Sequence, residues 1–255
     1  MELIEFLKDI INGFAESEII FSNEQDFQFQ MALALKGKKF ELEKGDNVTI
    51  TNVYLEGVSF KHNLKETYRL LKEAKKEEKK NEVKKEYTDI VLELDDDKNI
   101  AIELKYKTPY QPYLYETPNN EMLLLGQGAY DSGSYFFIKD LERLERINTK
   151  HFTRKYNFIK GYAIMLTNEK HYWKGFNSDI WNAFNICEGS VLENNLSLDL
   201  TKTNNPDKYK GFPTIKLKGK YVIKSGDWCD YPITIKNNCP IFKYLIKEVE
   251  LKAKI

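Results

Sequence analysis

Two carboxylates and one amine lie on two neighbouring strand-like segments, residues 89–94 and 99–106. Asp89 begins the first segment, and Glu103 and Lys105 lie near the end of the second. A polar turn joins the segments, which predicts a hairpin with Asp89 opposite the region of Glu103 to Lys105. Such close carboxylates repel each other unless a divalent cation lies between them, and oxygen ligands favour Mg²⁺ or Mn²⁺ over zinc. A neighbouring lysine can orient a water or stabilise a phosphoryl oxygen, so the pattern indicates phosphodiester hydrolysis.

The alternation along the second segment separates a charged face from an apolar face. Glu103 and Lys105 are two residues apart and therefore project from the same side of a strand. The alternate residues of this segment project from the other side and are apolar: Ile100, Ile102, Leu104 and Tyr106. Charged groups on a hairpin with apolar flanks need a reason. The plain alternative is an ordinary hairpin whose charges face solvent.

The spacing of these residues resembles a known nuclease core. Asp89, followed fourteen residues later by Glu103-Leu104-Lys105, is similar to the D…(D/E)xK core of the PD-(D/E)XK nuclease superfamily. Thr88 stands where the family name has its proline. The resemblance implies that Asp89, Glu103 and the Leu104 carbonyl bind Mg²⁺, with Mn²⁺ as a substitute. It also implies that Lys105 positions a water for in-line attack on phosphorus, leaving a 5′-phosphate.

The same resemblance suggests further site residues. The family often has a glutamate on a preceding helix, and Glu24 matches that role, with Asp26 as a second candidate. Glu24 orients the lysine or reaches a second metal in this reading; its plain alternative is a first-turn glutamate that meets the helix dipole. Gln127 and Tyr130 are spaced one residue short of the Q-x-x-x-Y element of one branch, so we take them as supporting residues only.

Periodicity predicts a mixed α/β protein with a central mixed β-sheet flanked by helices. The resemblance implies that its core is restriction-endonuclease-like. Ser22 and Gln25 fit a capping box at the start of the second helix. We expect one domain over residues 1–255, with the core at about 20–170 and residues 171–255 as an unassigned extension packed on it. The expected helices are 3–14, 22 to Gly37, a charged helical insertion over 61–86, a helix within 126–148 and a helix over 240–253. The expected strands are a hairpin of 40–43 and 48–55, the hairpin of 89–106, a strand over 158–167, and a strand or hairpin over 212–224.

Composition excludes several other classes of protein. The chain has 39 Lys and Arg against 39 Asp and Glu, which argues against coating DNA by bulk charge. No apolar run approaches the roughly 18 residues of a membrane span, and no signal peptide is visible, so we expect a cytoplasmic protein. Three cysteines without a CxxC pair, and three scattered histidines, disfavour a disulfide framework and a zinc hydrolase.

These observations predict a Mg²⁺-dependent nuclease that acts on DNA in a restriction, phage-defence or repair role. Nucleic acid is the expected partner, with a homodimer or partner proteins of a defence system as further partners. One alternative is a catalytically silent relative that binds nucleic acid or protein, and another is an interaction module with an exposed charged hairpin. A second basic region over 202–224, with interleaved aromatic residues, suits either nucleic-acid contact or protection of a strand edge.

Overall fold

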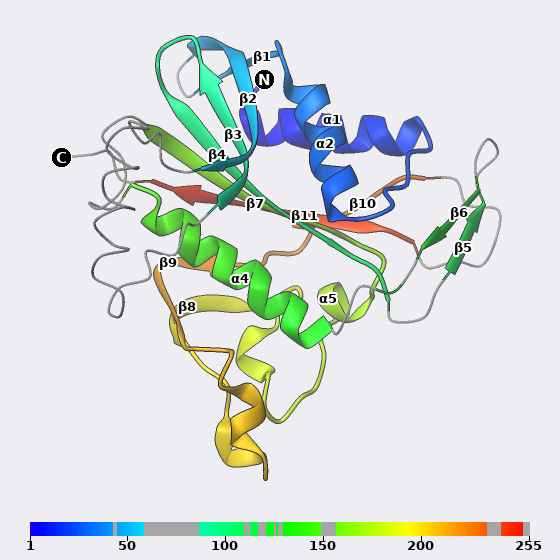
Figure 1. The fold of residues 1–255 in the computed structure, drawn as a ribbon, viewed down its shortest axis with the longest axis vertical. Helices are drawn as coiled ribbons and strands as arrows, with labels where there is room; N and C mark the ends of the chain where they lie inside the picture. The colour runs from blue at the N-terminus through cyan, green and yellow to red at the C-terminus, as the bar shows by residue number, and fades with distance from the viewer. Residues whose placement is uncertain are drawn as a thin grey trace, which may run out of the picture.

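The computed structural model describes residues 1–42, 45–58, 87–109, 113–116, 121–124, 126, 130–148, 157–233 and 241–251. The charged helix expected over 61–86 and the supporting residue Gln127 therefore lie outside the described residues. Within these ranges the protein combines helices with one large mixed sheet (Figure 1). The predicted α/β class is confirmed.

A seven-stranded sheet forms the centre of the molecule, in the order β1-β2-β3-β4-β7-β11-β10. Neighbouring strands run antiparallel except β4 and β7, which are parallel. The expected hairpin of Asp89 and Glu103 is the pair β3–β4, in the centre of this sheet. The strands are β1 (Lys39–Glu41), β2 (Asn47–Val58), β3 (Tyr87–Leu94), β4 (Asn99–Lys107), β7 (Phe158–Thr167), β10 (Trp228–Asp230) and β11 (Lys243–Glu250).

Helices cover both faces of the sheet (Figure 1). The helices α1 (Leu3–Glu16) and α2 (Glu24–Leu35) pack on one face, where Ile100, Leu104 and Tyr106 contribute to an apolar core. Helix α4 (Tyr130–Arg146) packs on the other face with Ala101 and Val91. Glu103 and Lys105 lie two and four residues after Ala101 on the same strand, so their side chains project to the same face, toward α4.

Helix α2 begins one residue later than the predicted capping box. Asn23 is the N-cap, and its side chain accepts a hydrogen bond from the Asp26 amide at 2.9 Å. Asp26 in turn accepts from the amide of Ser22, the residue before the N-cap, at 2.9 Å. Asn23 therefore takes the N-cap role predicted for Ser22, and the return bond from Asp26 goes to Ser22 where a capping box would bond the N-cap amide. This start places Glu24 in the first turn of the helix.

The helix predicted over 240–253 is wrong for the residues that the structure describes. Residues 243–250 form β11, which pairs with β7 on one side and β10 on the other. Phe242, Leu245, Ile246 and Val249 are spaced as on a helix, but they are buried on both faces of a central strand. A strand covered on both faces loses its simple alternation, so periodicity alone misassigned it.

The region between β7 and β11 contributes a small lobe beyond α4 (Figure 1). Its two strands, β8 (Val191–Leu196) and β9 (Ile215–Val222), form a separate antiparallel pair, and β9 confirms the strand predicted within 212–224. The other short elements are β5 (Tyr113–Glu116), β6 (Glu121–Leu124), α5 (His171–Lys174) and the 3₁₀ turns Asn182–Phe184, Leu200–Lys202 and Pro206–Tyr209. None of the helices in the described ranges is long and apolar enough to cross a membrane.

Candidate active site

The edge of β4 that faces β3 is completed by two carboxylates. The register between β3 and β4 ends at the pair Ile90–Ile102. Beyond that pair, the Leu104 amide donates to Asp89 Oδ2 at 2.7 Å, and the Tyr106 amide donates to Glu24 Oε2 at 3.0 Å. Backbone donors inside a protein need partners, and here side chains from β3 and α2 supply them. The same contacts fix both carboxylates beside the last residues of β4.

The Lys105 ammonium lies among three oxygen atoms. It is 2.8 Å from the Leu104 carbonyl, 2.9 Å from Asp140 Oδ2 and 3.5 Å from Glu24 Oε1. Burial alone would lower the pKa of Lys105, but the carboxylates of Asp140, Glu24 and Asp89 together raise it above the ordinary value. The lysine is therefore a fixed positive charge at neutral pH.

Glu103 lies next to the Lys105 site and is covered by α4, where it contacts Arg143. Its side chain has no exposed surface, and Arg143 Nε donates to its Oε1 at 2.9 Å while Arg143 Nη2 donates to Oε2. Arg143 also contacts Asp140 Oδ1 at 2.9 Å. Burial and the nearby Asp140 raise the pKa of Glu103, and the bidentate arginine opposes that rise. The ion pair with the Arg143 guanidinium offsets the cost of burying the Glu103 carboxylate away from water.

Asp89 is half-buried on β3. Its Oδ2 accepts from Leu104, its backbone carbonyl accepts from Gln28 Nε2, and Oδ1 has no partner among the described residues. Burial raises the pKa of Asp89, while Lys105 and the Leu104 amide act in the opposite direction. The Glu24 side chain beside it is 36% exposed, so the cluster can be reached from solvent on this side.

The structure brings four of the predicted residues into one cluster: Asp89, Lys105, Glu24 and the Leu104 carbonyl. Glu103 adjoins it, with its carboxylate turned toward Arg143. Of the two helix candidates, Glu24 reaches the cluster, whereas Asp26 caps its own helix. The ring of Tyr130 stacks on His171 at 4.4 Å and contacts Phe176, and no contact with the cluster is found among the described residues.

Three residues of this cluster were missed by sequence reasoning. Asp140 and Arg143 come from α4, and Gln28 comes from α2 one turn after Glu24. Asp140 falls among the buried positions 137, 141 and 144 of an amphipathic helix, where a charge is unexpected. That misplacement is the signal that could have identified it, and Arg143 follows three residues later on the same side.

The exposed-hairpin alternative is wrong for this face. Side-chain exposure is 0% for Glu103, 13% for Lys105 and 6% for Asp140. A surface face of ordinary charges would leave such groups in water, whereas α4 covers these. The burial requires the charges to be paired, and the structure pairs them through the two cations.

The oxygen donors are of the chemical type that a hard divalent cation prefers. Asp89, Glu103, Glu24 and Asp140 supply four carboxylates, and within the described residues the cations paired with them are Lys105 and Arg143. The structure does not gather these carboxylates around one point. No group of three potential metal ligands of the His, Cys, Asp and Glu types is gathered within the described ranges, since Glu103 faces Arg143 and the ammonium already contacts the Leu104 carbonyl.

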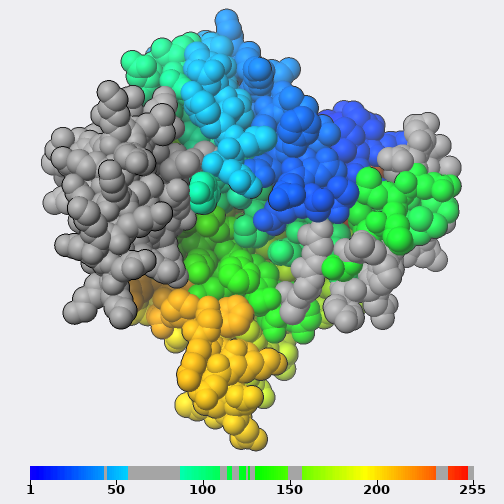
Figure 2. Space-filling model, viewed as in Figure 1, coloured from blue at the N-terminus to red at the C-terminus, as the bar shows by residue number. Residues whose placement is uncertain are grey.

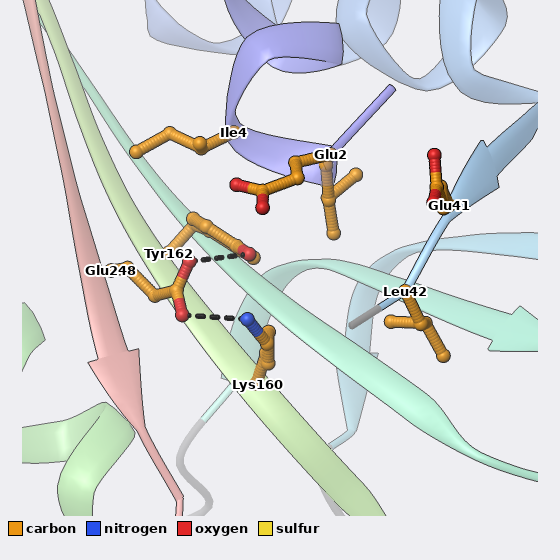
Figure 3. A pocket seen from close by; sticks show the side chains of 8 residues that line it. Glu2, Ile4, Glu41, Leu42, Lys160, Tyr162 and Glu248 are labelled. Carbon is orange, nitrogen blue, oxygen red and sulfur yellow. Dashed lines mark hydrogen bonds and ion pairs between the residues drawn. The ribbon is translucent and has the colours of Figure 1, made fainter. Parts of the chain in front are cut away.

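A small pocket lies on the opposite face of the sheet. It has a volume of about 190 Å³ and is lined by residues of α1, β1, β7 and β11 (Figure 3). Lys160 Nζ and the Tyr162 hydroxyl both contact the Glu248 carboxylate, each at 2.8 Å. The pocket contains none of the residues of the cluster beside β4.

No protein-family model, no curated protein and no solved structure matches the chain. The fold and the cluster define an α/β protein with a mixed central sheet and a buried charged centre between β4 and α4.

Proposed function

We propose that the chain is a metal-dependent nuclease whose active centre is the cluster beside β4. The observation that carries the proposal is the meeting of Asp89, Glu24 and Lys105 at the open edge of β4, with Glu103 directly behind. These are the residues in which the sequence resembles the PD-(D/E)XK core. DNA is the proposed substrate, in a restriction, phage-defence or repair role.

The protein's own groups have distinct tasks in this mechanism. Lys105 carries a permanent charge, so it orients an attacking water and stabilises negative charge on a phosphoryl oxygen instead of acting as a base. Asp89, Glu103 and the Leu104 carbonyl would hold Mg²⁺ or Mn²⁺ once the Glu103 carboxylate has turned from Arg143 and the ammonium has left the Leu104 carbonyl. Glu24 would be directed at the lysine. A bound metal ion supplies Lewis acidity and lowers the pKa of water.

Helix α4 supplies two positioning residues. Arg143 holds the Glu103 carboxylate by two hydrogen bonds, and Asp140 holds the Lys105 ammonium at 2.9 Å. Because Arg143 also contacts Asp140, the four groups form one chain of ion pairs. A shift of α4 would therefore move Glu103 and Lys105 together.

A catalytically silent binding protein is the second candidate function. Its support is the bidentate Arg143, which takes both oxygens of Glu103. In a silent protein this ion pair is purely structural. The two candidates differ in whether metal and Lys105 matter for turnover.

The deciding experiment compares the wild type, Lys105→Ala and Lys160→Ala on plasmid, linear duplex and single-stranded DNA and on RNA. Each protein is incubated with Mg²⁺, Mn²⁺ or EDTA. Lys160 is a matched control, because it is also an ion-paired lysine on a sheet strand but belongs to the opposite face. We expect metal-dependent cleavage by the wild type and Lys160→Ala and none by Lys105→Ala. Equal cleavage by all three proteins, or none by the wild type, would reject the nuclease.

A further inference from the structure

The lobe of residues 191–223 projects from the body of the molecule beyond α4 (Figure 2). It contains six lysines and three acidic residues. Lys210 is paired with Asp207 at 3.0 Å and Lys220 with Glu193 at 3.2 Å. The other four lysines are exposed and form no salt bridge with any residue in the described part of the chain; they are Lys202, Lys208, Lys216 and Lys218.

Strand β9 presents its lysines in a row. Ile215, Leu217 and Tyr221 are buried, whereas Lys216, Lys218 and Lys220 are exposed. Successive side chains of a strand point to opposite faces, so the three lysines share the outer face at intervals of roughly 7 Å. This spacing is comparable to that of phosphates along an extended nucleic-acid backbone.

Protection of a strand edge does not explain the lysines. One edge of β9 pairs with β8, and the other is capped by α4. The Lys216 amide donates to Glu142 at 3.0 Å, and the Lys218 amide donates to Glu145 at 2.8 Å. Since carboxylates already occupy this edge, the lysine side chains are not needed to prevent strand pairing.

The aromatic residues of the lobe pack against the protein. Phe212 and Tyr209 pack edge to face on Trp181, which precedes the lobe, at 4.8 and 5.9 Å. Tyr221 is buried, and its hydroxyl donates to Glu145 at 2.8 Å. These rings are not free to stack on bases, so the groups left for a ligand are ammonium groups, which recognise phosphates.

Helix α4 connects the lobe to the candidate active site. Asp140 and Arg143 face the sheet, and Glu142 and Glu145 hold β9. These pairs alternate within six residues, so the backbone of β9 lies about one helix diameter, roughly 10 Å, from the charged cluster. A nucleic acid bound at the cluster can therefore also contact β9.

We propose that the exposed lysines of the lobe, above all Lys208, Lys216 and Lys218, bind the phosphate backbone of a nucleic acid whose scissile phosphate lies at the β4 cluster. The proposal rests on the nuclease function and adds where the substrate is held. Recognition by these groups is electrostatic, because ammonium groups pair with phosphates.

The test measures binding separately from cleavage. Fluorescence anisotropy with a labelled 30-bp duplex in EDTA compares the wild type with a Lys208→Ala, Lys216→Ala, Lys218→Ala triple variant. The matched control is a Lys36→Ala, Lys38→Ala, Lys39→Ala triple variant, whose three exposed lysines follow the far end of α2. Each protein is titrated at several salt concentrations, and thermal unfolding verifies that all three are folded.

We expect the lobe variant to lose at least about tenfold in affinity and roughly two to three in the slope of log K against log salt, since each phosphate contact contributes about 0.9. The control variant should stay within about twofold of the wild type. Equal loss in both variants, no loss in the lobe variant, or no binding by the wild type would overturn the proposal. If binding depends on the lobe but no metal-dependent cleavage occurs, the proposed nuclease function is rejected. Nucleic-acid binding by the lobe lysines is then still supported.

Discussion

Two clusters of ion pairs on opposite faces of the sheet have similar distances and different surroundings. Under α4, Lys105 lies 2.9 Å from Asp140; in the pocket of Figure 3, Lys160 lies 2.8 Å from Glu248. Side-chain exposure is 13% and 6% in the first pair and 21% and 28% in the second. Judged by their N–O distances alone, the two ion pairs would be expected to contribute equally to stability.

Burial separates the two clusters. In the pocket, Lys160 and Tyr162 contact Glu248, and Glu2 and Glu41 also line it. Beside β4, four carboxylates lie with two paired cations among the described residues, and most of these side chains are more deeply buried. Partly exposed pairs contribute little, whereas an unpaired buried charge is costly. The comparison indicates that the β4 cluster is maintained at a cost in stability, as expected for a functional centre.

The largest expected effect is on cleavage. Asp89→Asn should reduce metal-dependent cleavage by at least about 10³-fold, because it removes a proposed metal ligand. The amide oxygen can still accept the Leu104 hydrogen bond, and one negative charge leaves an acidic cluster. The midpoint of urea unfolding should therefore stay the same or rise. An inactive variant that is also markedly destabilised would assign Asp89 a structural role instead.

Removing the arginine should give the largest loss of stability. Arg143→Ala leaves the Glu103 carboxylate buried without its bidentate partner, and we expect the free energy of unfolding to fall by about 3–5 kcal/mol. Adding Glu103→Gln should restore part of that loss, because the amide carries no charge. Urea denaturation of the two variants measures this coupling. Additive effects of the two substitutions would contradict the ion-pair assignment.

Metal ions should distinguish the clusters by a smaller effect. Mg²⁺ or Mn²⁺ at about 10–100 times its Kd should stabilise the wild type by roughly 1.5–3 kcal/mol. Thermal unfolding with and without EDTA measures the shift, with Ca²⁺-free buffer throughout. Asp89→Asn should lose the shift, and Glu248→Gln should keep it. Stabilisation that survives Asp89→Asn would place the cation elsewhere.

The sequence identified the hairpin and most of the cluster because their signals are local. Alternation placed Glu103 and Lys105 on one face, and the turn length placed Asp89 opposite them. The Arg143 and Asp140 partners depend on how α4 packs on the sheet, which no spacing within the hairpin determines. The strand β11 was missed for a related reason, because its burial on both faces arises from long-range pairing with β7 and β10.

The start of α2 offers a finer test, since it positions Glu24. Asn23→Ala removes the N-cap that binds the Asp26 amide, and we expect a loss of about 1 kcal/mol in the free energy of unfolding. Gln25→Ala is the control, because the capping box predicted from sequence used Gln25 where the structure uses Asp26. Chemical denaturation of both variants decides between the two caps. A larger loss for Gln25→Ala would favour the cap predicted from sequence.

The smallest effect belongs to the pocket cluster. Lys160→Ala removes an ion pair whose two side chains are partly exposed, and we expect less than about 1 kcal/mol of destabilisation. Raising the salt concentration should shrink that difference further, because solvent screens the charges. Urea unfolding at low and high salt measures both effects beside Arg143→Ala, whose larger loss should be nearly insensitive to salt. Equal losses in the two variants would show that burial does not separate the two clusters, and the inference drawn from their different surroundings would fail.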